Sequence, residues 1–472
     1  MDRGELSSTD LTKHCLSRIS ALEDRLHSFL TVLESSALQD AAASDARRRS
    51  GTALGPLDGI PIAIKDNIST AGVRTTAGSK ILDSYVPPFD AHVVERLRAS
   101  GAVIVGKANL DEFAMGSSNE NSAFGPVRNP WDVNRVPGGS SGGPAAAVSA
   151  GEAVVSLGSD TGGSIRQPAA LCGIVGMKPT YGLVSRYGLI AFASSLDQIG
   201  PFARDVTDCA ILLEAISGHD PRDSTSLQRP RETFVGSLRG GIKGVRVGVP
   251  REYLVDGIEP GVRRAFESAL QTLTSLGAAV EECSLPLTDQ ALAVYYILAP
   301  SEASANLARF DGFKYGHSSP GARTAWDTMD LSRAEGFGSE VKRRILLGGY
   351  ALSAGYYDAY YKKAQQVRTL IRREFADAFE RFDALVTPTS PTVAFKLGSR
   401  TQDPLSMYLS DVCTIPVNIA GLPGISLPGG MSDGLPVGLQ VIGPQFGDAR
   451  ILRIAYTYEQ ATEWHLKRPE IN

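Results

Sequence analysis

Two segments rich in glycine and serine lie about twenty residues apart in this chain of 472 residues. Residues 136–143 read V-P-G-G-S-S-G-G, and residues 158–168 read G-S-D-T-G-G-S-I-R-Q-P. Glycines allow several backbone N–H groups to converge on one point, which is what an oxyanion or a phosphate requires. The simpler alternative is a pair of flexible loops whose turns are capped by serine.

Phosphate binding is the first chemistry to weigh. Residues 101–108 read G-A-V-I-V-G-K-A and imitate a Walker loop. Ala108 has no hydroxyl to hold magnesium, and the interior Val-Ile-Val is typical of a strand rather than of a phosphate cradle. The sequence therefore argues against a nucleotide site here.

An α/β-hydrolase is the second alternative, because residues 138–142 match the pattern G-x-S-x-G. That mechanism needs a histidine downstream of the serine, and the chain offers only His219, His317 and His465. None of them lies in a glycine-rich turn next to a strand. We expect each to be a surface histidine or one satisfied by local hydrogen bonds.

Lysine is the next candidate for a base. Residues 56–67 read P-L-D-G-I-P-I-A-I-K-D-N, so that Lys65 ends an apolar run. Loss of hydration lowers the pKa of a lysine, and a neutral amine can accept a proton. The alternative is a surface lysine at the end of a strand.

These three blocks together resemble the amidase signature family. The resemblance extends over essentially the whole chain and is densest in residues 57–201, where Lys65 and Ser140 are 75 residues apart and Ser140 and Ser164 are 24 apart. It implies that Ser164 is the nucleophile and that Ser140, after a cis peptide bond from Gly139, relays a proton. Lys65 would be the general base and then the acid.

The resemblance also implies the remaining parts of a site. The oxyanion hole would be formed by the backbone N–H groups of the loop ending at the nucleophile: Thr161, Gly162, Gly163 and Ser164. Independently of the resemblance, we expect Asp160 and Arg166 to pair beside this loop, either as support for it or as an ordinary surface pair. No metal site is implied.

Within this family the chain resembles the glutaminase subunits of tRNA-dependent amidotransferases. The phrases that carry the closer resemblance are residues 116–132, 185–201, 302–312 and 407–416. It implies that glutamine is bound by Tyr295, Arg344 and Asp411. Arg344 would hold the α-carboxylate, Asp411 the α-ammonium group, and Tyr295 would give a hydrogen bond.

The same resemblance implies partners. The B and C subunits of such an enzyme would complete a heterotrimer, and ammonia would pass to the B subunit. That partner, with ATP and Mg²⁺, would convert Glu-tRNA(Gln) to Gln-tRNA(Gln), so this chain would need no cofactor of its own. Two alternatives stay open: a stand-alone amidase acting on another carboxamide, and an inactive scaffold.

The elements that must position these residues can be read from the apolar pattern. The first fifty residues are predicted to be helical, and helix–glycine–strand units are predicted at 92–105 and at 262–282, the second after a strand at 245–249. Further predictions are a loop at 218–244, a helix at 357–381 leading to a strand at 384–387, a strand pair at 424–427 and 436–442, and a helix from 449. The fold class predicted is α/β, with a mixed sheet covered by helices on both faces. We expect a helical segment at 1–50 packed on one amidase domain at 51–472.

The composition of the chain excludes several classes of protein. Hydrophobic residues make up 43% and charged residues 21% of the chain, and the net charge is −4. Such a balance is typical of globular proteins and offers no basic surface for direct nucleic-acid binding. Five cysteines without a C-x-x-C pair argue against a disulfide scaffold. Without an apolar leader or membrane span (prolines interrupt 412–432), a cytoplasmic location is expected.

Overall fold

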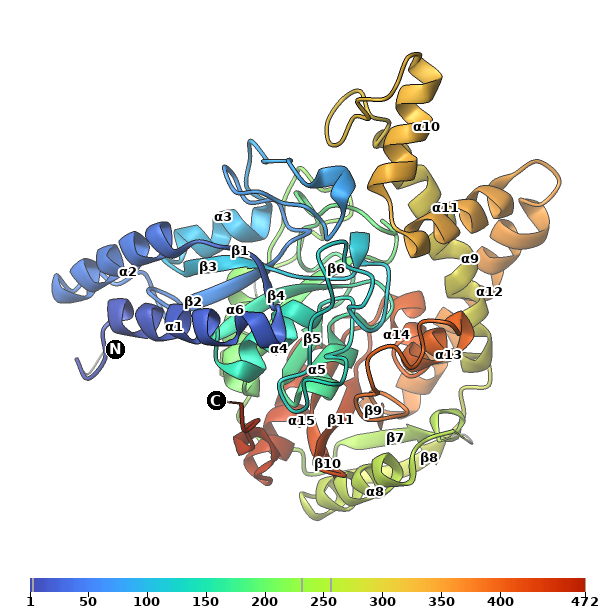
Figure 1. The fold of residues 1–472 in the computed structure, drawn as a ribbon. Helices are drawn as coiled ribbons and strands as arrows, with labels where there is room; N and C mark the ends of the chain where they lie inside the picture. The colour runs from blue at the N-terminus through green and yellow to red at the C-terminus, as the bar shows by residue number, and fades with distance from the viewer. Residues whose placement is uncertain (2–3, 231, 255–256, 472) are drawn as a thin grey trace.

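One mixed sheet of 11 strands runs through the molecule, in the order β1-β3-β2-β4-β6-β5-β10-β11-β9-β7-β8. The computed structural model describes residues 1, 4–230, 232–254 and 257–471. Figure 1 shows the sheet enclosed by helices. The strands are β1 Phe29–Val32, β2 Pro61–Lys65, β3 Val103–Ala108, β4 Val155–Asp160, β5 Val175–Lys178, β6 Gln198–Ala203, β7 Arg246–Pro250, β8 Ala279–Cys283, β9 Ala384–Pro388, β10 Gly424–Ser432 and β11 Leu435–Ile442.

Parallel pairs occur in two places. Strand β2 runs parallel to β3 and β4, and β7 runs parallel to β8 and β9. All other neighbours are antiparallel, including β4 with β6 and β10 with β11. The predicted mixed sheet is confirmed.

Helices cover both faces of this sheet. In β9, Ala384 and Val386 belong to the same hydrophobic cluster as residues of α3, α6, α8 and α15. Leu385 belongs to a second cluster, with residues of α9, α12 and α14 Ile415–Ala420. Successive side chains of a strand point to opposite faces, so these two clusters are the two sides of one sheet. The longer helices are α1 Ser8–Leu26, α2 Glu34–Arg49, α3 His92–Ala99, α4 Gly142–Ala150, α6 Val206–Ile216, α8 Pro260–Ser275, α9 Thr288–Asn306, α10 Ala325–Gly336, α11 Ser339–Leu352, α12 Lys363–Arg381 and α15 Asp448–Gln460.

Both predicted helix–glycine–strand units are present. Helix α3 ends just before Gly101, which has φ +74°, and β3 follows. Glycine adopts this left-handed conformation without the penalty of a Cβ. Helix α8 likewise ends before Gly277, and β8 pairs in parallel with β7 as a βαβ unit requires. The strand pair β10–β11 and helix α15 also lie where they are predicted.

The first fifty residues differ from the prediction because they contain a strand. His27 ends α1 in the left-handed conformation, with φ 57°, and β1 then pairs antiparallel with β3. Phe29, predicted to continue a helix, is a buried residue of this strand. Helical spacing of apolar residues cannot reveal a strand of four residues whose partner lies far along the chain. The predicted boundary at residue 50 stays a prediction.

Smaller differences occur elsewhere. The predicted loop at 218–244 contains a short helix, α7 Phe234–Ser237, and a turn of π-helix at Asp358–Lys362 precedes α12. None of the helices in the described ranges is both long and apolar enough to span a bilayer.

Candidate active site

The candidate site lies where two parallel strands end. Lys65 is the last residue of β2, and Ser159 and Asp160 are the last residues of β4. These strands are neighbours, with Ile64 paired to Leu157, so their carboxyl ends meet at one edge of the sheet. Crevices at the carboxyl ends of strands are the usual ligand sites of open α/β sheets.

Lys65 is completely buried at this edge. Its Nζ lies 2.8 Å from Ser140 Oγ, 2.7 Å from Ser141 Oγ and 2.9 Å from Ser159 Oγ. Burial lowers the pKa of Lys65 to about 7, although the charges of Asp111 and two other acids oppose this. The alternative of a surface lysine is therefore wrong, and the amine is poised to lose its proton near neutral pH.

Ser140 follows a cis peptide bond from Gly139, as expected. The C=O of Ser140 accepts a hydrogen bond from the Asp111 N–H at 3.2 Å. A Cβ on Gly139 would lie 2.2 Å from Asp111 Oδ2, so only glycine fits at this position. Helix α4 begins two residues after Ser140, and Pro144 stands in its first turn, where proline is well tolerated.

Ser164 lies on the adjoining loop, between β4 and the short helix α5 Arg166–Cys172. Its C=O accepts a hydrogen bond from the Ser141 N–H at 3.3 Å, which joins the two loops. Its hydroxyl has no hydrogen-bond partner within the described ranges, so no direct bond links it to Ser140. Catalytic hydrogen bonds of unliganded sites often tighten only when substrate binds.

The predicted oxyanion loop is held from several sides. The N–H of Gly163 donates to Asp160 Oδ1 at 2.8 Å, and the C=O of Gly162 accepts from Thr414 Oγ1 at 2.7 Å. The Thr161 hydroxyl donates to Asp197 at 2.7 Å. The N–H of Gly163 is thus already engaged, whereas those of Thr161 and Gly162 have no partner among the described residues.

Asp160 and Arg166 form a buried ion pair at 3.1 Å, so the alternative of a surface pair is wrong. Burial alone would raise the pKa of Asp160, but Arg166 lowers it to about 2. Arg166 also donates to Gln440 Oε1 at 2.8 Å and to the Asn418 side chain. Gln440 and Asn418 are far along the chain, and no local pattern marks them.

The structure brings Asp411 and Tyr295 to the same loop. A Cβ on Gly163 would lie 3.4 Å from Asp411 Oδ1, and a Cβ on Gly162 would lie 3.0 Å from the Tyr295 hydroxyl. Asp411 is buried, its Oδ2 accepts a hydrogen bond from the Ser117 hydroxyl, and its Oδ1 has no partner among the described residues. Burial raises the pKa of Asp411 to about 7. An unpaired carboxylate oxygen here suits a cationic ligand group.

Arg344 is buried on α11. Its Nε donates to Glu340 at 2.8 Å, and its guanidinium lies 5.5 Å from the ring centre of Phe192 and 5.7 Å from that of Tyr408. A small pocket beside it is lined by Arg344, Tyr408 and Gly116, among other residues. A cation in such a pocket fits an anionic ligand group.

The two alternative chemistries find no support. Lys107, the lysine of the Walker-like segment, is buried in β3, where Nζ lies 3.2 Å from Asp66 and 2.6 Å from Thr75 Oγ1. His219 is exposed, and His317 bonds Glu335 at 2.7 Å. The side chain that bonds Ser140 Oγ is that of Lys65 rather than of a histidine.

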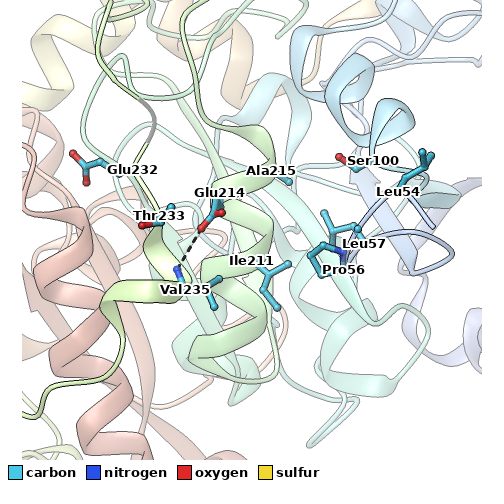
Figure 2. A pocket seen from close by; sticks show the side chains of 11 residues that line it. Leu54, Pro56, Leu57, Ser100, Ile211, Glu214, Ala215, Glu232, Thr233 and Val235 are labelled. Carbon is cyan, nitrogen blue, oxygen red and sulfur yellow. Dashed lines mark hydrogen bonds between the residues drawn. The ribbon is translucent and has the colours of Figure 1, made fainter. Parts of the chain in front are cut away.

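A separate hollow of about 330 Å³ lies between α6 and the loop ahead of β2. Figure 2 shows its lining, which includes Leu57, Ile211 and Glu214. None of the predicted site residues takes part, so this hollow plays no role in the candidate site.

Comparison with known proteins agrees with this geometry. The family model described as Amidase matches residues 10–452. The A subunit of the glutamyl-tRNA(Gln) amidotransferase of Moorella thermoacetica is 60% identical over 100% of this chain and 96% of its own length. The corresponding protein of Chloroflexus aggregans is 59% identical over 99% of this chain and 96% of its own length.

Solved structures give the same result. The corresponding amidotransferase protein of Thermotoga maritima superposes with a TM-score of 0.82 at 47% identity, covering 98% of this chain and 95% of that one. The peptide amidase of Stenotrophomonas maltophilia superposes with a TM-score of 0.83 at 35% identity, covering 100% and 96%. The chain belongs to the amidase signature family, and within it to the group of glutamyl-tRNA(Gln) amidotransferase A subunits.

Proposed function

We propose that this chain hydrolyses the side-chain amide of glutamine and supplies the ammonia to a partner subunit. The observation that carries the proposal is the meeting of two groups at one loop. Lys65 bonds Ser140, and the next residue, Ser141, donates its N–H to the C=O of Ser164 at the end of the 161–164 loop. The unpaired oxygen of Asp411 lies next to Gly163 of the same loop. The residues proposed for hydrolysis and the carboxylate proposed to bind an α-ammonium group thus lie beside the same short loop.

In the proposed reaction Ser164 Oγ attacks the carboxamide carbon. Its proton passes to Ser140, whose own proton passes to neutral Lys65. The tetrahedral intermediate then collapses, the C–N bond breaks, and the proton returns through Ser140 to the departing ammonia. Water releases glutamate from the acyl-enzyme by the same path. The lowered pKa of Lys65, about 7, suits both directions of proton transfer.

The neighbours of Lys65 orient its lone pair. A neutral amine has two N–H bonds. Ser141 Oγ donates to the Ser159 C=O at 3.0 Å, so toward Lys65 it acts as an acceptor. Ser159 Oγ already accepts from Asn67 Nδ2 at 3.0 Å and can accept from Lys65 as well. Both N–H bonds are then used, and the lone pair points to Ser140.

The negative charge that develops on the substrate oxygen would be held by the N–H groups of Thr161, Gly162 and Ser164. Each such donor is worth about 2.7–4 kcal/mol in a transition state. Gly163 contributes through its N–H bond to Asp160, which fixes the loop, and through its lack of a Cβ.

Recognition of glutamine would use charge complementarity. Arg344 would hold the α-carboxylate and Asp411 the α-ammonium group, which would satisfy the unpaired Oδ1. Tyr295, packed against Gly162, would give a hydrogen bond. Charge-assisted bonds of this kind are about twice as strong as neutral ones.

The partner would be the B subunit of a cytoplasmic heterotrimer that also contains a C subunit. The B subunit would bind Glu-tRNA(Gln) and use ATP and Mg²⁺ to accept the ammonia. This chain has an exposed aromatic surface suited to assembly, formed by Leu346, Tyr350, Tyr356, Tyr357 and Tyr360. In Figure 1 the α10–α11 region that carries part of it projects from the sheet. Clustered tyrosines are typical of protein interfaces.

The test is ammonia release by the natively purified protein, with whatever binds it, from glutamine and from simple aliphatic and aromatic amides. We expect release from glutamine that rises with Glu-tRNA(Gln) and ATP. Equal or better release from simple amides, without a tRNA effect, would instead establish a stand-alone amidase.

A further inference from the structure

Thr414 joins the turn that carries Asp411 to the loop that carries Ser164. It is completely buried, and its Oγ1 lies 2.7 Å from the C=O of Gly162 and 3.0 Å from that of Asp411. Its own N–H donates to the Asp411 C=O at 3.0 Å, and its C=O accepts from Arg166 at 3.1 Å. Every polar group of Thr414 is therefore engaged within the site.

The C=O of Gly162 and the N–H of Gly163 belong to one peptide unit. Thr414 holds the oxygen of this unit, and Asp160 holds its N–H at 2.8 Å. The peptide is thus fixed at both ends, by side chains that come from opposite sides. Its orientation sets the directions of the neighbouring N–H groups of Gly162 and Ser164.

The side chain of Thr414 packs closely against Gly163. A Cβ on Gly163 would lie 2.1 Å from Thr414 Oγ1, and Gly163 has φ +144°, a conformation that favours glycine. Two adjacent glycines give a loop many alternative backbone conformations, including a reversed 162–163 peptide. A contact from outside the loop is therefore needed to fix the backbone conformation in which the oxyanion donors are aligned.

We infer that Thr414 is a positioning residue, which fixes the oxyanion loop and links it to the turn that carries Asp411. This inference rests on the proposed hydrolytic function of the loop, but not on glutamine as the substrate. Without the hydroxyl, the C=O of Gly162 loses its buried partner and the 162–163 peptide is free to reorient. The oxyanion donors would then be misaligned in the transition state.

The test compares Thr414→Val with Thr414→Ser in the full complex. Valine keeps the shape but removes the donor, and we expect kcat to fall about 10–100-fold while KM changes by less than about threefold. Serine keeps the donor, and kcat should stay within about threefold of the wild type. The pH at which kcat is half-maximal should not move, because Lys65 keeps its surroundings.

Thr389→Val is the matched control. Thr389 is also completely buried, and its hydroxyl bonds Ser426 Oγ at 2.9 Å, a contact that involves none of the site residues. We expect this variant to lose stability but to keep kcat. If Thr414→Val does not fold, Thr414→Cys, with a weak donor of similar size, should show an intermediate loss of kcat.

Three results would overturn the inference: unchanged kcat in Thr414→Val or Thr414→Cys, a Thr414→Ser variant as slow as Thr414→Val, or an equal loss in Thr389→Val. The assay uses whichever amide the wild type hydrolyses best. If glutamine is not that amide, the proposed substrate fails, and the ratio of variant to wild-type kcat still tests Thr414.

Discussion

The residues proposed to break the amide bond and those proposed to recognise glutamine are positioned by different parts of the fold. Lys65, Ser140 and Ser164 lie within about 100 residues of one another in the sequence, at strand ends and on the adjoining loops. Tyr295, Arg344 and Asp411 come from three separate helices in the second half of the chain. The first group is fixed by the sheet and the second by how helices pack upon it.

The two groups also differ in how many of their polar atoms have hydrogen-bond partners within the protein. Lys65 has a hydroxyl partner in each of Ser140, Ser141 and Ser159. Asp411 leaves one buried carboxylate oxygen unpaired among the described residues. Preorganised catalytic groups lower the activation barrier for any substrate that reaches them. A binding group with an unpaired polar atom is stabilised only by a ligand that supplies the missing partner. Changes in the first group should therefore alter kcat for every amide, and changes in the second should alter KM for glutamine.

The largest effect is expected from Ser164→Ala. Removal of the proposed nucleophile should lower kcat by about 10⁴-fold or more with every amide, as in enzymes with a known serine nucleophile. Ammonia release measures this. Ser156→Ala is the control and should be nearly neutral, since among the described residues that buried hydroxyl bonds only the Pro144 C=O. Comparable activity in Ser164→Ala would contradict the proposed mechanism.

A smaller and more selective effect is expected from Arg344→Lys. Lysine keeps the charge but loses the planar fork, so KM for glutamine should rise about 10–100-fold. KM and kcat for a simple amide without a carboxylate should hardly change. A loss shared by both substrates would show that Arg344 supports the catalytic loop rather than recognition.

The pH profile should separate the two groups. Lys65 is an effective base only above its lowered pKa of about 7, so kcat should fall about tenfold per pH unit below that value. Asp411, with its pKa raised to about 7, loses its charge over the same range, which should raise KM. Asp411→Asn should remove the rise in KM and leave the fall in kcat. An acid limb of kcat near pH 5 would contradict the role of Lys65.

The smallest effect on chemistry is expected from the exposed aromatic surface. Leu346→Asp combined with Tyr356→Ser should leave glutamine hydrolysis by the isolated chain within about twofold, because both side chains are exposed. Recovery of the B and C subunits with the tagged chain should drop. Full recovery of both partners would place the interface elsewhere. Tyr315→Ser, another exposed tyrosine, is the control.

Much of the catalytic group could be predicted from sequence because its signals are local. An apolar run of strand length predicts that Lys65 ends a strand, and glycine blocks mark the two loops. The catalytic roles of Lys65, Ser140 and Ser164 came from family resemblance. The helix–glycine–strand units are equally local, since a glycine stop and a short β-branched run need no partner to be recognised. The roles of Tyr295, Arg344 and Asp411 came from family resemblance, because nothing in their own neighbourhoods marks them.

Other features were decided only by the tertiary structure. Strand β1 forms because it pairs with the edge of β3. Arg166 can be buried because Asp160, Gln440 and Asn418 accept its hydrogen bonds. Thr414 meets Gly162 across 252 residues of sequence. Local patterns in the sequence predicted the strand that Lys65 ends and the glycine-rich loops that carry Ser140 and Ser164, and family resemblance supplied the roles of these residues in amide hydrolysis. Which distant side chains hold those residues in place depends on packing between elements, and no local pattern encodes that.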